Sequence, residues 1–279
     1  MMSEIKLIAL DLDGTLLDSE KRLSAGNEAA LKECIRRGIA VVPCTGRIWW
    51  GVPDFIREIP GIRYGITMNG AVVEDVKEGK ILDERRMSCE LALDILALAK
   101  EFDTMYDVYS GGSALGEERF LNCLDEYGIP PVIQKIVIST RRVVPDVTEE
   151  VRRRNRPVDK INYFFGDLEE RERARAALLA RGDVIVSSSL ENNLEINAPG
   201  ATKGEALLRL ARHLGIRPEQ TMGFGDGEND IALLRMAGIG VAMGNACDTA
   251  KKAADYVTLT NDEDGVAAAI EKLIFKRLP

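Results

Sequence analysis

Histidine is almost absent from this sequence of 279 residues, because His213 is the only one. One imidazole cannot form a multi-histidine metal site, and His213 falls late in an amphipathic segment, where a cation near a helix C-terminus is ordinary. The five cysteines are scattered and include no CxxC pair, which argues against a zinc knuckle and against a disulfide framework. We therefore expect a cytoplasmic protein with free thiols.

Long apolar runs and an excess of positive charge are also missing. No stretch approaches about 18 uncharged apolar residues, and no basic segment leads into an apolar one at the start, so we expect neither a membrane span nor a signal peptide. Lys and Arg number 37 against 45 Asp and Glu, which gives a formal net charge of −8. Such a chain lacks the positive field that attracts nucleic acids and anionic membranes. A phosphate-bearing ligand would need a local cation, a metal or backbone N–H groups.

What the sequence does contain is an alternation of buried strands and amphipathic helices. Apolar residues make up 46% of the chain, and its length corresponds to roughly two domains at about 150 residues each. The N-terminal part predicts strands at residues 5–10, 39–43 and 64–68, with helices at 24–37 and 49–58. The C-terminal part predicts helices at 203–214, 228–236, 246–253 and 264–276, with strands at 221–224, 239–242 and 256–259. This alternation predicts an α/β fold with a doubly wound, Rossmann-like parallel sheet.

The middle of the chain has a different pattern. Helices are predicted at residues 88–102, 114–127 and 168–181, an extended segment at 132–140, and strands at 104–109, 160–165, 184–188 and 193–197. Strands that follow one another without a helical crossover, near residues 187–197, indicate antiparallel pairing. We therefore predict an α+β domain, residues 83–190, inserted into a core that consists of residues 1–82 and 191–279.

Two carboxylates follow the first predicted strand, in the sequence Asp11-Leu12-Asp13-Gly14-Thr15. Ligands of open α/β sheets bind beyond the carboxyl ends of the strands, so this position favours a functional site. Asp-x-Asp-Gly also occurs in calcium-binding loops, but Thr15-Leu16-Leu17-Asp18 lacks the further ligands that an EF-hand needs. The two carboxylates therefore indicate a polar crevice at the edge of the sheet.

Further polar groups stand where another strand ends and where one helix begins. Thr45 and Gly46 follow the second strand and can hold a phosphate oxygen through a hydroxyl and a backbone N–H, although Thr-Gly is also common in loops. Lys203 is predicted at a helix N-terminus, which is the unfavourable end for a cation. Its position therefore indicates that an anion lies nearby. An exposed lysine behind the N-cap Thr202 is the simpler interpretation for this residue taken alone.

The first strand after Lys203 ends in Gly223-Phe224-Gly225-Asp226-Gly227-Glu228-Asn229-Asp230. These glycines do not fit the dinucleotide-binding pattern GxGxxG, because Glu228 stands where the third glycine is needed. The acidic residues would also repel a pyrophosphate group. Asp226 and Asp230 instead suit a hard cation such as Mg²⁺, which prefers oxygen ligands.

Taken in order, these residues resemble the motifs of the haloacid dehalogenase superfamily: Asp11 with Asp13, then Thr45, then Lys203, then Asp226 with Asp230. The segments Thr45-Gly46-Arg47, Asn69-Gly70-Ala71 and Val241-Ala242-Met243-Gly244-Asn245-Ala246 are similar to the Cof-type branch of that superfamily. The inserted domain lies between the threonine and lysine motifs, as the large cap of that branch (type IIB) does.

The resemblance implies a Mg²⁺-dependent phosphatase that hydrolyses small phosphate monoesters, such as sugar phosphates, through an aspartyl-phosphate intermediate. Asp11 would be the nucleophile, and Asp13 the general acid and base. Mg²⁺ would be held by Asp11, the backbone carbonyl of Asp13, and Asp226, and Asp230 would orient a metal-bound water or Lys203. The groups that would hold the phosphate oxygens are the Leu12 backbone N–H, Thr45, Gly46, Lys203 and Asn229.

Three other functions use similar residues. A phosphomutase would return the phosphoryl group to its product, and a receiver-like signalling domain would keep its aspartyl-phosphate in order to switch a partner. The acid/base Asp13 and the inserted domain argue against a receiver domain. A dehalogenase needs neither Mg²⁺ nor the pair Asp226 and Asp230. We therefore expect the partner to be a small phosphorylated metabolite rather than a nucleic acid or a membrane.

Overall fold

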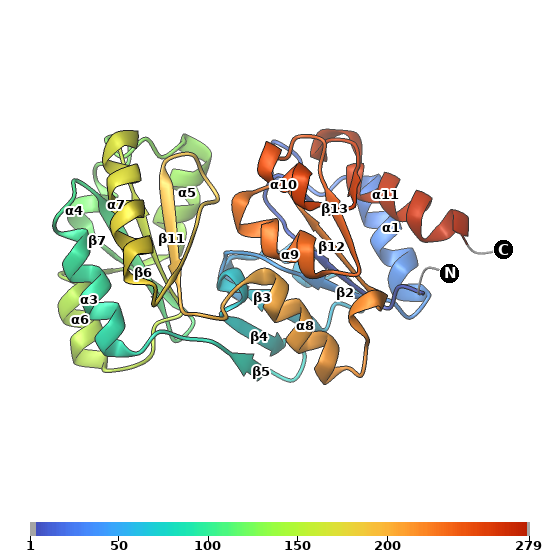
Figure 1. Cartoon of the computed structure of the whole chain (residues 1–279), viewed down its shortest axis with the longest axis horizontal. Coiled ribbons are helices and arrows are strands. Elements are labelled where there is room, and N and C mark those ends of the chain that lie inside the picture. Colours follow the sequence, from blue (N-terminus) through green and yellow to red (C-terminus); the bar gives the residue numbers. More distant parts are fainter. Residues whose placement is uncertain (1–3, 278–279) are drawn as a thin grey trace. The chain divides into compact units, whose positions relative to one another are not determined.

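The computed structural model describes residues 4–277 and divides the chain into two compact units (Figure 1). Of the described residues, 4–84 and 202–277 form the core unit, and 85–201 form the inserted unit. Within the described residues, no helix is both long enough and apolar enough to cross a membrane. We describe each unit by itself.

A five-stranded parallel sheet forms the centre of the core unit, in the order β14-β13-β12-β1-β2. Its strands are β1 (Leu7–Leu10), β2 (Ala40–Pro43), β12 (Thr221–Gly225), β13 (Ile239–Ala242) and β14 (Tyr256–Val257). Strand β1 is an interior strand, in which Leu7 pairs with Ala40 of β2 on one side and with Thr221 of β12 on the other. The doubly wound α/β core that the sequence predicts is therefore confirmed.

Helices cover both faces of this sheet because the side chains of β1 alternate between two apolar clusters. Ile8 and Leu10 pack with residues of α1 (Ala25–Arg36) and α11 (Gly265–Leu273). Leu7 and Ala9 pack with residues of α8 (Lys203–His213) and α9 (Ile231–Met236). Burial on both faces explains why the strand has an uninterrupted apolar sequence. The remaining helix of this part, α10 (Asp248–Ala253), lies near α9 and β13.

Two predictions for the N-terminal part of the core unit were wrong in detail. The third strand, β3 (Tyr64–Thr67), meets the parallel sheet through a single bridge between Ile66 and Cys44. It belongs to an antiparallel sheet with β4 (Val72–Asp75) and β5 (Lys80–Glu84), because the turn Met68–Gly70 reverses the chain. The predicted helix at 49–58 is divided into η1 (Trp49–Gly51) and α2 (Asp54–Arg57), because Pro53 holds the preceding residue in an extended conformation.

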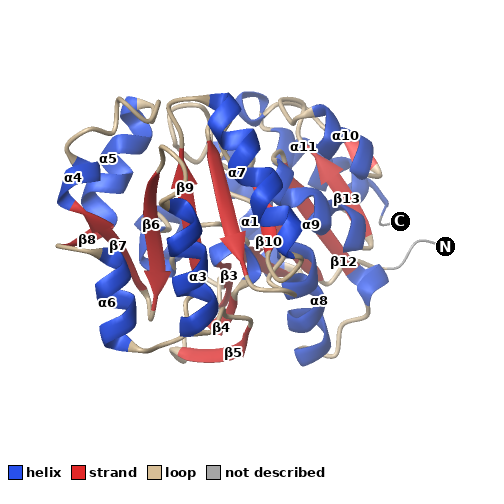
Figure 2. Ribbon diagram, turned by 60° about the vertical axis from the view of Figure 1, so that its left-hand side comes forward, coloured by secondary structure: helices blue, strands red, loops and turns tan. Residues whose placement is uncertain are grey.

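The inserted unit contains a six-stranded sheet in the order β10-β11-β9-β6-β7-β8. All neighbouring strands are antiparallel except β7 and β8, which are parallel. Helices α3 (Cys89–Ala99), α6 (Val147–Arg154) and α7 (Leu168–Arg181) lie over one face of this sheet (Figure 2). The strands are β6 (Met105–Ser110), β7 (Ser113–Glu117), β8 (Arg141–Val144), β9 (Lys160–Phe164), β10 (Ile185–Ser187) and β11 (Asn193–Asn197).

Two further predictions, both in the inserted unit, were wrong. Residues 114–127 do not form one helix, because Gly111 and Gly112, both with positive φ, turn the chain into β7, and only α4 (Glu118–Leu121) is helical there. The segment predicted as extended is the helix α5 (Pro131–Thr140). Its β-branched residues favour a strand, but Pro131 is well suited to the first turn of a helix, and Val137 is buried in the apolar cluster of the unit.

The inserted unit also extends beyond the expected last residue, 190. Strand β11 pairs with β9, so the chain leaves this unit only after Ala201. The first boundary lies after Glu84, two residues from the expected position.

Candidate active site

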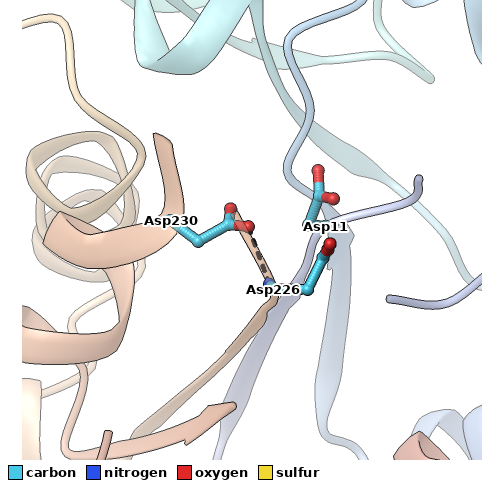
Figure 3. A group of neighbouring side chains, drawn as sticks. All are labelled: Asp11, Asp226 and Asp230. Carbon is cyan, nitrogen blue, oxygen red and sulfur yellow. Dashed lines mark hydrogen bonds between the residues drawn. The ribbon is translucent and has the colours of Figure 1, made fainter. Parts of the chain in front are cut away.

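Three carboxylates gather at the carboxyl ends of the parallel strands in the core unit. Asp11 follows β1, Asp226 follows β12, and Asp230 ends the short helix η4 (Glu228–Asp230) (Figure 3). Each offers an oxygen that lies within 4.8 Å of the oxygens of the other two. The Oδ2 atom of Asp230 also accepts hydrogen bonds from the backbone N–H groups of Asp226 and Gly227, both at 2.9 Å, which fixes the loop after β12. The structure thus brings three of the predicted site residues together.

Lys203 lies among these carboxylates and has no solvent exposure. Its Nζ donates to Oδ1 of Asp11 and to Oδ1 of Asp230, at 2.6 Å in each case. Burial alone would lower the pKa of Lys203, but the negative charges of Asp11 and Asp230 raise that pKa well above its usual range. The lysine is therefore positively charged although it is the first residue of α8, because two anions offset the unfavourable helix dipole.

One lysine does not balance the negative charge of this cluster. Burial raises the pKa of Asp11, and although Lys203 opposes this effect, the neighbouring carboxylates reinforce it. Burial and then Asp230 raise the pKa of Asp226 to about 7, although the Thr15 hydroxyl donates to Asp226 at 2.7 Å. Carboxylates that resist ionisation next to one another favour a further cation. Mg²⁺ prefers oxygen ligands, so the donor set fits this ion.

Gly14 allows the loop after β1 to approach Asp226 closely. Its φ is +83°, and a Cβ atom at this position would lie 2.5 Å from Oδ2 of Asp226. Any other residue would strain the backbone and push against a carboxylate of the cluster. The glycine in the Asp-x-Asp-Gly motif therefore has a steric explanation in the structure.

The carboxylate of Asp13 faces two cations. Arg47 donates to it through Nε at 2.8 Å and through Nη2 at 2.6 Å, and Nζ of Lys21 lies 2.8 Å from Oδ1. Burial alone would raise the pKa of Asp13, but Arg47 and then Lys21 lower it below its usual range. Neither cation was predicted from the sequence to be a site residue. Arg47 could have been identified from its place directly after Thr45 and Gly46, whereas Lys21 had no comparable signal.

The other predicted phosphate-binding residues also lie near the carboxyl ends of these strands. Leu12 lies between Asp11 and Asp13, and its carbonyl accepts from the N–H of Leu17 at 2.9 Å. Thr45 and Gly46 follow the end of β2; Thr45 is buried, and its hydroxyl accepts from the N–H of Arg47 at 3.2 Å. Asn229 lies in η4, and its Nδ2 donates to Oδ1 of Asn69 at 3.3 Å. The contact with Asn69 was not predicted.

Comparison with known proteins gives a consistent result. A family model of haloacid dehalogenase-like hydrolases matches residues 8–270. The chain is 35% identical to the phosphatase YwpJ of Bacillus subtilis over 97% of this chain and 100% of that protein. It is 30% identical to the 5-amino-6-(5-phospho-D-ribitylamino)uracil phosphatase YcsE of the same species, over 96% of this chain and 95% of that protein.

Solved structures have the same fold over almost the whole length. A haloacid dehalogenase-like hydrolase from B. subtilis superposes with a TM-score of 0.86 at 35% identity, covering 96% of this chain and 100% of that chain. The subclass IIB sugar phosphatase BT4131 superposes with a TM-score of 0.80 at 26% identity, covering 96% and 98%. The chain therefore belongs to the haloacid dehalogenase-like hydrolases, in the Cof-type branch, and is an enzyme of the phosphatase class.

Proposed function

We propose that this enzyme hydrolyses small phosphate monoesters with the help of Mg²⁺, through an aspartyl-phosphate formed on Asp11. The observation that carries the proposal is the buried Lys203, which contacts both Asp11 and Asp230 at 2.6 Å beside a cluster of three carboxylates. A buried cation next to a metal-compatible carboxylate cluster provides a site for an anionic group that also binds a metal. A phosphoryl group has these properties.

The carboxylates of Asp11 and Asp226 and the backbone carbonyl of Asp13 are the groups that would hold Mg²⁺. When bound there, Mg²⁺ would offset the repulsion between an anionic nucleophile and an anionic phosphate. Asp230 has a supporting role, since it contacts Lys203 and fixes the backbone of Asp226.

Asp11 is the proposed nucleophile. Its carboxylate attacks phosphorus, a new O–P bond forms, and the bond from phosphorus to the leaving oxygen breaks. Lys203 holds one carboxylate oxygen of Asp11, which fixes the orientation of the attacking group. Lys203, Thr45, Gly46, Asn229 and the Leu12 backbone N–H hold the other phosphate oxygens, where negative charge accumulates.

Asp13 is the proposed proton carrier. It gives a proton to the leaving oxygen, and then removes one from the water that hydrolyses the aspartyl-phosphate, so that the products are an alcohol and inorganic phosphate. The ion pairs with Arg47 and Lys21 favour the unprotonated carboxylate. Asp13 therefore takes up a proton, from solvent or from the bound ester, before it donates one to the leaving oxygen.

The inserted unit is proposed to be the cap domain that selects the leaving group. Its position in the chain, between the segments that carry Thr45 and Lys203, supports this role, as does its separate apolar core. Two relatives, by their names, act on a ribitylamino-uracil phosphate and on sugar phosphates. We accordingly propose a small phosphorylated metabolite as substrate.

The test measures release of inorganic phosphate from a panel of phosphorylated metabolites. We expect hydrolysis of at least one ester with Mg²⁺, loss of hydrolysis with a chelator, and loss of hydrolysis in Asp11→Asn. The matched control is Asp248→Asn, which alters an exposed aspartate in the first turn of α10 and should hydrolyse at the wild-type rate. Equal rates for Asp11→Asn and the wild type would refute the mechanism. Isomerised product without free phosphate would instead identify a phosphomutase.

A further inference from the structure

The turn Met68–Gly70 has no role in the mechanism above, yet it contacts three segments that carry proposed phosphate-binding groups. The backbone N–H of Asn69 donates to the carbonyl of Thr45 at 3.1 Å. The backbone N–H of Met68 donates to the carbonyl of Arg47, also at 3.1 Å. The turn is therefore fixed to the loop that follows β2.

The same turn packs against the start of α8. Gly70 has a φ of +96°, and a Cβ atom there would lie 2.3 Å from the carbonyl oxygen of Thr202. Thr202 is the N-cap residue of α8, and Lys203 is its first residue. In addition, Nη2 of Arg209, on the same helix, donates to the carbonyl of Gly70 at 2.8 Å. The position of the turn relative to Lys203 is thus set by direct contacts.

The side chain of Asn69 reaches the third segment. Asn69 is buried, and its Oδ1 accepts a hydrogen bond from Nδ2 of Asn229 at 3.3 Å. A primary amide has two N–H groups in one plane. Because one N–H of Asn229 is directed at Asn69, this hydrogen bond restrains the orientation of the amide and of its second N–H.

The backbone conformation of the turn determines which substitution can test the side chain of Asn69. Met68 and Asn69 have φ values of 50° and 58°, in the left-handed region that is unfavourable for residues with a Cβ atom. Glycine would adopt the conformation at position 69 without this cost. Asparagine is one of the few other residue types that adopt this conformation readily, so Asn69→Gly removes the side chain that contacts Asn229 and keeps a residue type suited to the backbone.

We propose that Asn69 is a positioning residue that holds the amide of Asn229 in the orientation in which Asn229 binds phosphate. The inference rests on the proposed phosphatase function, because Asn229 has a phosphate-binding role only in that mechanism. Asn69 acts through Asn229 and is not itself placed against the substrate.

The decisive variant is Asn69→Gly, which removes the amide and suits the left-handed backbone. Two measurements are made in the presence of Mg²⁺: kcat and KM for an ester that the wild type hydrolyses, and calorimetric binding of inorganic phosphate, which needs no turnover. We expect kcat/KM to fall by about tenfold and the Kd of phosphate to rise by a similar factor, while thermal stability is unchanged or higher. If Asn69 had only a structural role, the Asn69→Gly variant would lose activity together with thermal stability.

A double-mutant cycle with Asn229→Ala tests whether the effect passes through Asn229. In the Asn229→Ala background, Asn69→Gly should cause no further loss of phosphate affinity. The matched control is Asn155→Gly, which makes the same change at an exposed left-handed residue of the inserted unit and should leave kcat/KM unchanged.

Unchanged phosphate affinity in Asn69→Gly would overturn the proposal, and so would an equal loss in both backgrounds. If instead the proposed phosphatase function is wrong, the wild type hydrolyses no ester with Mg²⁺. In that case the calorimetric comparison of the wild type with Asn69→Gly still decides whether Asn69 contributes to phosphate binding.

Discussion

Arg47 binds Asp13 through two parallel hydrogen bonds, from Nε to Oδ2 at 2.8 Å and from Nη2 to Oδ1 at 2.6 Å. A third donor on the same guanidinium, Nη1, binds the carbonyl of Gly51 at 2.9 Å. The arginine therefore fixes the position of the carboxylate relative to the backbone of the following loop. Such two-point contacts constrain orientation as well as distance.

The first prediction concerns how the activity of an Arg47 variant depends on the leaving group of the substrate. Arg47→Gln should lower kcat for alkyl phosphates by about 10- to 100-fold, because a misplaced Asp13 transfers its proton poorly. The loss should be much smaller for p-nitrophenyl phosphate, whose leaving group needs little protonation. Asp13→Asn should show the same difference between substrates.

Arg57→Gln is the control for this experiment. Arg57 binds the carbonyl of Val52 and the side chain of Asp54 rather than Asp13, so the ratio of the two rates should stay at the wild-type value. Equal losses on both substrates in Arg47→Gln would show that the arginine does not act through proton transfer.

The second prediction concerns the buried lysine. Lys203→Met removes the buried cation that contacts both Asp11 and Asp230, so one oxygen of each buried carboxylate loses its charged hydrogen-bond donor. We expect a decrease in the free energy of unfolding of about 3 kcal/mol without metal, measured by urea unfolding, together with loss of hydrolysis.

The exposed pair Lys32 and Glu28 on α1 provides the comparison for Lys203. Lys32→Met should change the free energy of unfolding by less than about 1 kcal/mol, because the ion pair is in solvent. If both variants had the same small effect, the contacts of Lys203 would contribute little to stability.

The third prediction distinguishes two effects of a side chain at position 14: strain of a backbone with positive φ, and steric overlap with Asp226. Gly14→Ala should destabilise the protein and abolish the stabilisation by Mg²⁺, because its Cβ would lie 2.5 Å from Asp226. Gly79 also has positive φ, at +62°, but nothing lies within 4 Å of its Cβ position. Gly79→Ala should therefore cost only about 1 kcal/mol and keep the response to Mg²⁺. The measurement is the free energy of unfolding of each variant with and without Mg²⁺.

The position of the candidate site could be predicted from sequence because of the parallel sheet. Asp11 and Asp226 are far apart in the chain, yet they meet because they follow the neighbouring parallel strands β1 and β12, which end at one edge of the sheet. Only the strand order and the motifs are needed for this prediction. It does not depend on the conformation of the loops.

The contacts that depend on loop conformation could not be predicted in this way. The turn that carries the hydrogen bond between Asn69 and Asn229 has positive φ at Met68, Asn69 and Gly70, and Met68 is not of a type that favours that conformation. Helix α5 was predicted as extended for a related reason. Its local sequence favours a strand, and the tertiary packing of Val137 competes with that preference.

The fourth prediction concerns acid unfolding and Asp75, at the end of β4. The carboxylate accepts hydrogen bonds from Nε of Arg63 at 2.8 Å and from the backbone N–H groups of Lys77 and Glu78 at 3.1 Å. Burial alone would raise the pKa of Asp75, but Arg63 and the N–H of Glu78, followed by that of Lys77, lower it below its usual range. The folded state therefore favours the charged carboxylate more strongly than the unfolded state does.

The sign of the pH dependence follows from this pKa. The contribution of Asp75 to stability is complete above the unfolded pKa, at about pH 4, and is lost as the pH falls through the lower folded value. Asp75→Asn should thus differ from the wild type by a constant free energy of unfolding between about pH 5 and pH 7, and this difference should shrink below about pH 4. Arg63→Gln should reproduce part of the effect, since it removes one of the three donors. A difference that stays constant down to the lowest pH at which the protein is folded would show that the charge of Asp75 does not stabilise the β3–β4 hairpin.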